Sequence, residues 1–193
     1  MRFLSIIILY SFIFCKSESQ GLFKIVETKR TRPFLIDSEK SNFTQKYFKI
    51  LCAKKDSSDI LKAPSFCFKN IDTIEAIKDL LAYQGDLRIN YIPVVNYDLE
   101  QSRIYWGKCR NYSIQVEALF LINQLIFDHP YHYSSYPVLV KRDTNEESSI
   151  SGDIVCKAFA EYRKWYEQMK KIGIYKIKTE KIMPLDNSGI SWY

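Results

Sequence analysis

The chain's two histidines lie close together beside a carboxylate, in Asp128-His129-Pro130-Tyr131-His132. One carboxylate and two imidazoles at this spacing supply three ligands of the kind that zinc and similar metal ions prefer. Asp128, His129 and His132 are therefore candidate metal ligands of a hydrolase or other metal-dependent enzyme. The alternative is a polar loop, because Pro130 keeps the segment out of a helix and the two rings do not share a helical face.

Tyrosines gather in the same stretch of a chain that contains 14 Tyr, 12 Phe and 3 Trp. Tyr131, Tyr133 and Tyr136 lie in what we expect to be a loop rather than a helical stripe. Exposed tyrosine offers rigid apolar contact area with a polar tip, which suits the recognition of a protein. These three residues are candidate partner-binding residues. The alternative is that their rings cover the ends of a buried helix.

Other features that support catalysis are scarce in this sequence. It contains no Gly-x-Ser-x-Gly motif and no glycine-rich phosphate loop. Glu117 lies in the apolar stretch 113–127, where burial would raise the pKa of its carboxyl group. The alternative is that Glu117 lies on the solvent-exposed edge of a helix or pairs with a nearby lysine. We therefore assign no catalytic residue and expect no cofactor.

The cysteines suggest a disulfide framework. Apart from Cys15, the chain holds Cys52, Cys67, Cys109 and Cys156, an even set that suits two bridges in an oxidising compartment. We prefer the pairs Cys52 to Cys67 and Cys109 to Cys156, because the first closes a short loop, which is worth about 3 kcal/mol. The alternative is four free thiols, since a domain of this size needs no covalent staples.

The N-terminus has the three-part pattern of a secretory signal peptide. Arg2 is followed by a nearly uncharged apolar run to Cys15, shorter than the roughly 20 residues that span a bilayer, and then by Ser17-Glu18-Ser19. We expect cleavage after Ser19 and a secreted, periplasmic or cell-envelope protein. The alternative is a lipoprotein anchored through Cys15.

The charge balance excludes some partner classes. The chain carries 28 Lys and Arg against 22 Asp and Glu, a net charge of +6, and the positive residues are spread along it. Nucleic-acid binding usually needs a basic stripe, which we do not find. We therefore expect no nucleic-acid partner, and contact with a membrane only through the signal or a lipid anchor at Cys15.

Hydrophobic periodicity predicts the elements that position these residues. Asp72, with Glu75 at the third position, caps a helix that Gly85 terminates. Residues 113–127 are apolar nearly all round and predict a buried central helix. The other predicted elements are helices over 43–51 and 153–172, a helical turn within 98–106, an edge strand or linker over 87–95, a small hairpin opened by 138–140 and a turn at 143–145, and a C-terminal tail that packs on the body.

These elements together predict a mainly α domain of about five helices around the 113–127 helix, with minor extended or hairpin segments. It occupies residues 41–193, after a signal peptide (1–19) and an extended lead-in (20–40). We expect an exported, non-enzymatic envelope protein that binds an unknown protein partner, as an inhibitor or immunity-type factor. The alternative is a small exported hydrolase or metal-dependent enzyme that uses the Asp128-His129/His132 loop.

Overall fold

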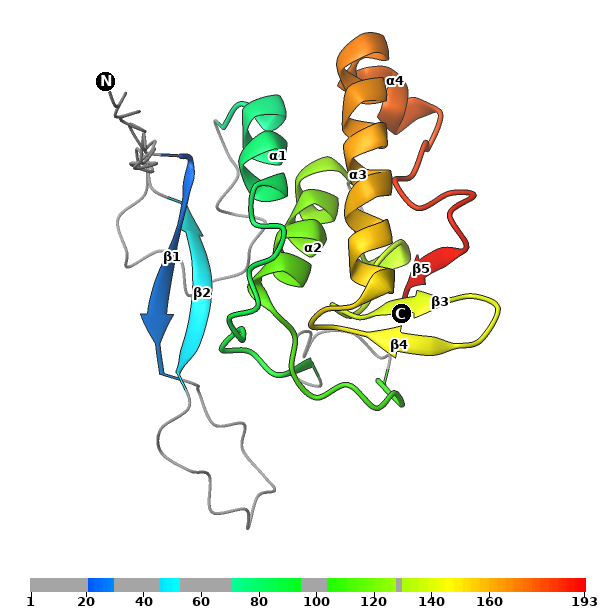
Figure 1. The fold of residues 1–193 in the computed structure, drawn as a ribbon. Helices are drawn as coiled ribbons and strands as arrows, with labels where there is room; N and C mark the ends of the chain where they lie inside the picture. Colours follow the sequence, from blue (N-terminus) through cyan, green and yellow to red (C-terminus); the bar gives the residue numbers. More distant parts are fainter. Residues whose placement is uncertain (1–20, 30–45, 53–70, 95–103, 128–129) are drawn as a thin grey trace, which may run out of the picture.

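The computed structural model describes residues 21–29, 46–52, 71–94, 104–127 and 130–193. Three helices lie between a two-stranded sheet and a three-stranded sheet (Figure 1). The elements, in chain order, are β1 (Phe23–Thr28), β2 (Tyr47–Cys52), α1 (Thr73–Leu81), α2 (Ile114–Ile126), the short 3-10 helix η4 (Pro130–His132), β3 (Leu139–Lys141), β4 (Glu146–Ser148), α3 (Asp153–Ile172), α4 (Ile174–Thr179) and β5 (Ile190–Trp192).

Both sheets are antiparallel. β1 pairs with β2 so that Ile25 lies opposite Ile50. In the second sheet β3 is central, and the strand order is β4-β3-β5. Leu139 of β3 lies opposite Ser148 on one side and Trp192 on the other, which places the C-terminal strand beside the β3–β4 hairpin.

The fold is mixed α/β, so the prediction of a mainly α domain of about five helices is wrong. The described residues contain four α-helices and two antiparallel sheets. The error lies chiefly in the helix predicted over 43–51, since Tyr47–Cys52 forms strand β2. A short run of aromatic and aliphatic residues suits a strand as well as a helix. The strand that pairs with it, β1, lies in the segment expected to be an extended lead-in.

Predictions that depend on local sequence signals are confirmed. The Asp72 side chain accepts a 3.0 Å hydrogen bond from the backbone N–H of Glu75 and so caps α1. Helix α3 covers the predicted range and ends at Gly173, whose φ of 88° suits glycine. The predicted hairpin is present as β3 and β4, with Asn145 at a φ of 55° in its turn.

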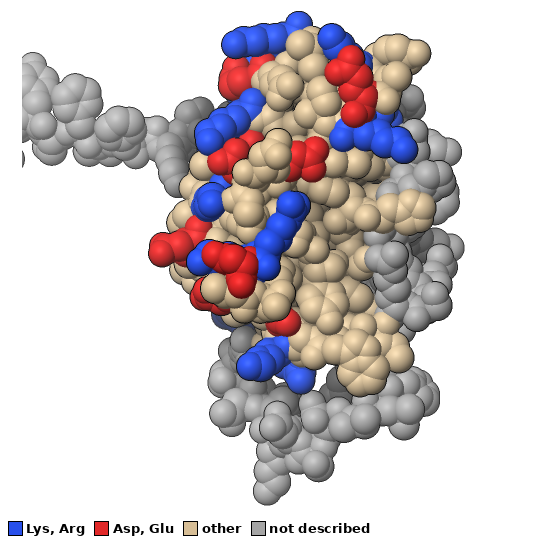
Figure 2. All heavy atoms as spheres, turned by 90° about the vertical axis from the view of Figure 1, so that its right-hand side faces the viewer, with Lys and Arg blue, Asp and Glu red and all other residues tan. Residues whose placement is uncertain are grey.

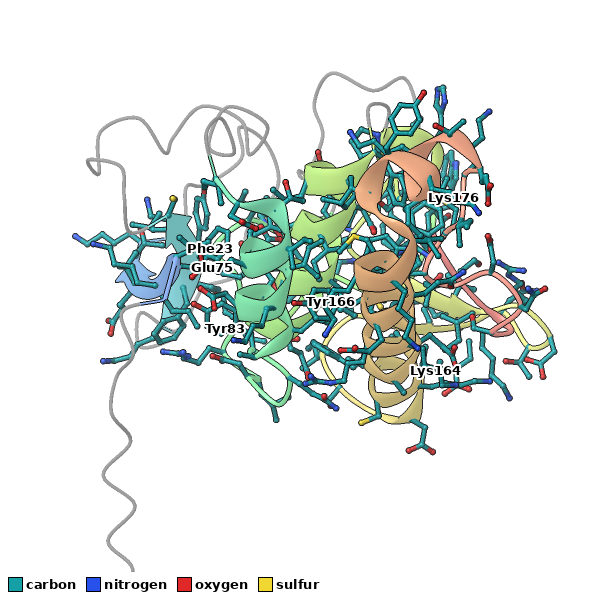
Figure 3. The ribbon with its side chains drawn as sticks, turned by 90° about the horizontal axis from the view of Figure 1, so that it is seen from above. Phe23, Glu75, Tyr83, Lys164, Tyr166 and Lys176 are labelled. Carbon is teal, nitrogen blue, oxygen red and sulfur yellow. The ribbon has the colours of Figure 1, made fainter. Side chains whose placement is uncertain are left out.

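The core is built around α2 and α3. Nearly every side chain of α2 is buried, as its apolar composition predicts. Helix α3 buries one aromatic stripe, which includes Phe159, Tyr162 and Trp165. Seen from above, Phe23 of β1 lies toward α1, and Tyr166 of α3 lies between α3 and α1 (Figure 3). The layers are therefore joined by large side chains.

A chain of buried hydrogen bonds fastens the C-terminal strand to this core. The indole N–H of Trp192 donates to the Tyr162 hydroxyl at 2.8 Å, and that hydroxyl donates to Asn123 Oδ1 at 2.7 Å. The Asn123 side-chain amide then donates to Ser134 Oγ at 3.1 Å. Because these groups lie away from water, their hydrogen bonds specify how β5, α3 and α2 fit together.

The charged surface is mixed in sign. On the face shown in Figure 2, positive and negative side chains are interspersed from the top down the left side to the bottom, whereas the area at right centre holds few of them. Three exposed ion pairs lie on these helices: Lys164–Glu161, Lys170–Glu167 and Lys176–Glu180. Each such pair stabilises the fold by less than about 1 kcal/mol. No helix in the described part of the chain has the length and apolar composition needed to cross a bilayer.

Candidate functional site

The most unusual surface of the described residues lies in the segment that leads into α2. Side chains alternate there between solvent and interior: Ile104, Trp106, Lys108 and Arg110 are exposed, whereas Tyr105 is buried. Ile104 is 66% exposed and Trp106 is 81% exposed. Trp is among the largest apolar side chains and is usually mostly buried. We call the four exposed residues the 104–110 edge.

Glu147 of β4 accepts several hydrogen bonds from this segment. One carboxylate oxygen, Oε2, accepts hydrogen bonds from the Tyr105 hydroxyl at 2.7 Å and from the backbone N–H of Lys108 at 2.8 Å. A longer bond of 3.4 Å comes from the backbone N–H of Cys109, which also donates to the Tyr105 hydroxyl at 2.9 Å. A carboxylate that accepts several such bonds fixes the path of the backbone.

Tyr193 also contacts this segment, through a hydrogen bond and through its ring. The backbone N–H of Trp106 donates to the hydroxyl of Tyr193 at 3.1 Å. The Tyr193 ring lies 4.5 Å from the Tyr105 ring and 5.9 Å from the Tyr136 ring, measured between centroids, and Tyr105 and Tyr136 are 5.2 Å apart. These spacings are typical of favourable aromatic pairs. Trp106 therefore projects from a backbone that is fastened on two sides.

Gly107 is required by this packing. A Cβ atom at this position would overlap the hydroxyl of Tyr105 and lie 2.5 Å from Glu147 Oε1. No real Cβ comes that close to another heavy atom, so any side chain here would push Tyr105 and Glu147 apart. The absence of a side chain lets the segment pass directly over the hydrogen-bonded pair.

The ionisation of this pair follows from its contacts. Burial alone would raise the pKa of Glu147, but hydrogen bonds from Tyr105, Lys108 N–H and Cys109 N–H outweigh it and hold the pKa below its usual value. Burial, and then the bond to Glu147, raise the pKa of Tyr105 well above its ordinary value. At neutral pH the pair is therefore a tyrosine donor and a charged acceptor.

The tyrosines proposed from sequence as partner-binding residues lie mostly inward. Tyr136 is 3% exposed and packs against Tyr105 and Tyr193. Tyr133 is half-buried, its ring lies 5.2 Å from that of Phe127, and its hydroxyl accepts a 2.9 Å hydrogen bond from the backbone N–H of Leu185. The side chain of Tyr131 lies outside the described residues. Tyr136 thus supports the 104–110 edge from below instead of presenting its ring to solvent.

The predicted metal ligands are described only in part. His132 lies at the end of η4 with an exposed side chain, whereas Asp128 and His129 lie outside the described residues. Within the described ranges, no three His, Cys, Asp or Glu side chains come together as a group that could hold a metal ion. Metal binding at Asp128, His129 and His132 stays a prediction.

Glu117 is a buried carboxyl group in the first turn of α2. It is 7% exposed, and its Oε2 atom has no hydrogen-bond partner among the described residues. Burial raises its pKa to about 8, although the Tyr112 hydroxyl acts in the opposite direction by favouring the charged form. Tyr91 is also close enough for the charge of Glu117 to raise its pKa, after the larger effect of burial. The carboxyl group is therefore largely protonated at neutral pH.

The cysteines do not form the predicted framework. Cys52, Cys109 and Cys156 are free, with Cys52 buried and Cys156 exposed on α3. The predicted bridge between Cys109 and Cys156 is therefore wrong, and so is the bridge from Cys52 to Cys67, whose second partner lies outside the described residues. The physical reason is that α2 and the two antiparallel sheets bury enough apolar surface to stabilise the domain without covalent links.

Neither the signal peptide nor Cys15 lies within the described residues, and no observation supports secretion or lipid attachment. Cleavage after Ser19 and lipidation at Cys15 stay predictions.

Sequence reasoning missed the 104–110 edge because residues 98–106 were expected to form a helical turn. The described part, from Ile104 onward, is not helical. The alternation of large apolar or basic residues with Tyr105, Gly107 and Cys109 was the available signal, since a period of two is typical of an extended segment. Comparison of the chain with protein-family models, with curated proteins and with solved structures found no match.

Proposed function

We propose that this protein works by binding another protein, and that the 104–110 edge is the contact surface. The observation that carries this proposal is the 81% exposure of Trp106 on a backbone fastened by Glu147 and Tyr193. An exposed Trp on a loose loop would have no particular use. One that the fold holds outward is ready to enter a pocket.

The energetics favour such a use. Burying an exposed Ile or Trp side chain against a partner contributes about 2 to 3 kcal/mol, and Trp is enriched among the residues that dominate protein interfaces. Because Tyr105 and Glu147 already order the backbone, the segment loses little conformational entropy when a partner binds. Ile104 and Trp106 therefore suffice as a small hot spot, with the polar residues around them as its rim.

A rigid presentation points to a protein rather than a lipid surface. A fluid membrane adapts to any side chain that enters it, so fixing the direction of Trp106 brings no advantage there. A folded partner has a pocket of fixed shape, and preorganisation of Trp106 then increases affinity. This reasoning concerns the edge alone and names no particular partner.

Site-specific photo-crosslinking tests the proposal. A photoreactive phenylalanine analogue replaces Trp106, and in a control replaces Tyr175, which is 84% exposed on α4. In an extract of cells that make this protein, position 106 should crosslink one partner, and excess unlabelled wild-type protein should suppress the product. An excess of the Trp106→Ala variant should not suppress it. Equal competition by both proteins, or equal products from positions 106 and 175, would contradict the proposal.

A further inference from the structure

The order of side chains along the 104–110 edge carries information about what binds there. Two apolar side chains, Ile104 and Trp106, are followed at the same spacing of two by two cations, Lys108 and Arg110. All four are exposed, and the backbone bends at Gly107 and Lys108, so the apolar pair comes before the bend and the basic pair lies in and after it.

The cationic side chains of this edge are not held in ion pairs by the described residues. Within the described ranges, neither Lys108 nor Arg110 takes part in an ion pair. The nearest bonded carboxylate, Glu147, is directed at the Tyr105 hydroxyl and at backbone N–H groups. Arg110 donates from Nη1 to the carbonyl oxygen of Gly107 at 2.9 Å, which orients the guanidinium and leaves its other N–H groups for a ligand.

Part of the backbone of the segment is already hydrogen-bonded within the protein. The N–H groups of Trp106, Lys108 and Cys109 donate to Tyr193, Glu147 and Tyr105. The carbonyl oxygen of Arg110 accepts a 3.0 Å hydrogen bond from Val94 N–H, and that of Gly107 accepts from Arg110. A partner therefore cannot add as a further strand at these particular groups, and the exposed side chains offer the main contacts.

We infer that the segment of the partner that binds this edge is acidic, with apolar side chains next to carboxylates. The apolar side chains cover Ile104 and Trp106, and the carboxylates face Lys108 and Arg110. Opposite charges that face each other in this way steer association and favour an acidic partner over a neutral one. This inference rests on the proposed function, because it presumes that the 104–110 edge binds a protein.

A matched pair of labelled peptides tests the inference with the full chain. In the first peptide, two leucines and then two glutamates alternate with serines; in its twin, glutamines replace the glutamates. Binding is measured by fluorescence anisotropy at low and high salt. The first peptide should bind at least tenfold more tightly than its twin, and added salt should remove most of this difference.

Variants separate the two parts of the argument. The double reversal Lys108→Glu/Arg110→Glu should weaken binding of the acidic peptide at least tenfold, whereas Lys157→Glu/Lys171→Glu on α3 should change it less than twofold. Both control lysines are exposed. Trp106→Ala should abolish binding of both peptides. Circular dichroism and thermal unfolding confirm that each variant is folded.

The outcomes distinguish the inference from the proposed function. Equal affinity for the two peptides, with loss of both on Trp106→Ala, would overturn the acidic segment and leave the protein-binding edge in place. Binding that ignores Trp106→Ala would overturn both. Trp106-dependent binding to vesicles of anionic phosphatidylglycerol and neutral phosphatidylcholine, with no peptide bound, would assign the edge to a lipid surface instead.

Discussion

The hydroxyl of Tyr105 donates a 2.7 Å hydrogen bond to the carboxylate of Glu147, which lies 42 residues further along the chain. This contact joins the segment before α2 to strand β4. It also explains why neighbouring side chains have opposite surroundings, since Tyr105 turns inward to reach Glu147 while Ile104 and Trp106 turn outward.

Replacing Glu147 should loosen the 104–110 edge. In Glu147→Gln the charged acceptor is lost, and the Tyr105 hydroxyl and the Lys108 N–H keep at best weaker bonds, so we expect a loss of about 1 to 2 kcal/mol of unfolding free energy. Chemical denaturation measures it. Glu146→Gln, an exposed neighbour, is the control and should have almost no effect.

The same carboxylate should give a defined pH dependence. Because the pKa of Glu147 is lower in the fold than its ordinary value of 4.5, its stabilising effect is complete above that value. The effect is lost as the pH falls through the lower folded pKa. The stability difference between wild type and Glu147→Gln should therefore shrink as the pH falls below about 4.5. A difference that grew under acid conditions would contradict a charged Glu147.

Tyr162 should be essential to the buried polar chain. Tyr162→Phe leaves the indole N–H of Trp192 and Asn123 Oδ1 without their common partner in a dry environment, and each unsatisfied group costs about 1 to 3 kcal/mol. We expect a marked fall in melting temperature. Tyr166→Phe on the same helix is the matched control, and a similar fall there would show that the polar chain is not the cause.

Glu117 should destabilise the protein as the pH rises. Its pKa is raised from 4.5 to about 8, so the folded state keeps a proton that the unfolded state loses between these values. A shift of this size corresponds to about 5 kcal/mol of stability lost across that interval. Glu117→Gln carries no titrating proton, so the variant should lack this slope and be more stable than wild type at pH 9. Parallel pH profiles of the two proteins would contradict a buried neutral carboxyl group.

Cys156 should behave as a free surface thiol. It is exposed on α3, so iodoacetamide should modify it in the native protein, as peptide mass spectrometry would show. Cys156→Ser should keep the wild-type melting temperature with or without a reducing agent. A reductant-dependent drop in the wild type that disappears in both Cys156→Ser and Cys109→Ser would instead demonstrate a bridge between these residues.

Some elements could be predicted because their signals are local. The Asp72 cap, the aromatic stripe of α3 and its end at Gly173 each depend on residues within a few turns of one another. The burial of α2 follows likewise from its composition. Backbone geometry and helical periodicity act over short stretches of chain, so the sequence alone determined these features.

Other features depend on contacts between distant parts of the chain. Whether Tyr47–Cys52 becomes a strand is decided by pairing with β1, because a short apolar run suits either structure until an edge is available. Whether a tyrosine is exposed is decided the same way: Tyr136 is buried by Tyr105 and Tyr193.

The 104–110 edge shows this division most clearly. The sequence by itself determined that Ile104, Trp106, Lys108 and Arg110 alternate with Tyr105, Gly107 and Cys109, which suits an extended segment with two unlike sides. Only the tertiary structure decided which side meets water, because Glu147 and Tyr193 form the contacts that draw the Tyr105 side inward. Hydrogen bonds across 42 and 87 residues cannot be read from local spacing, and they alone direct Trp106 outward.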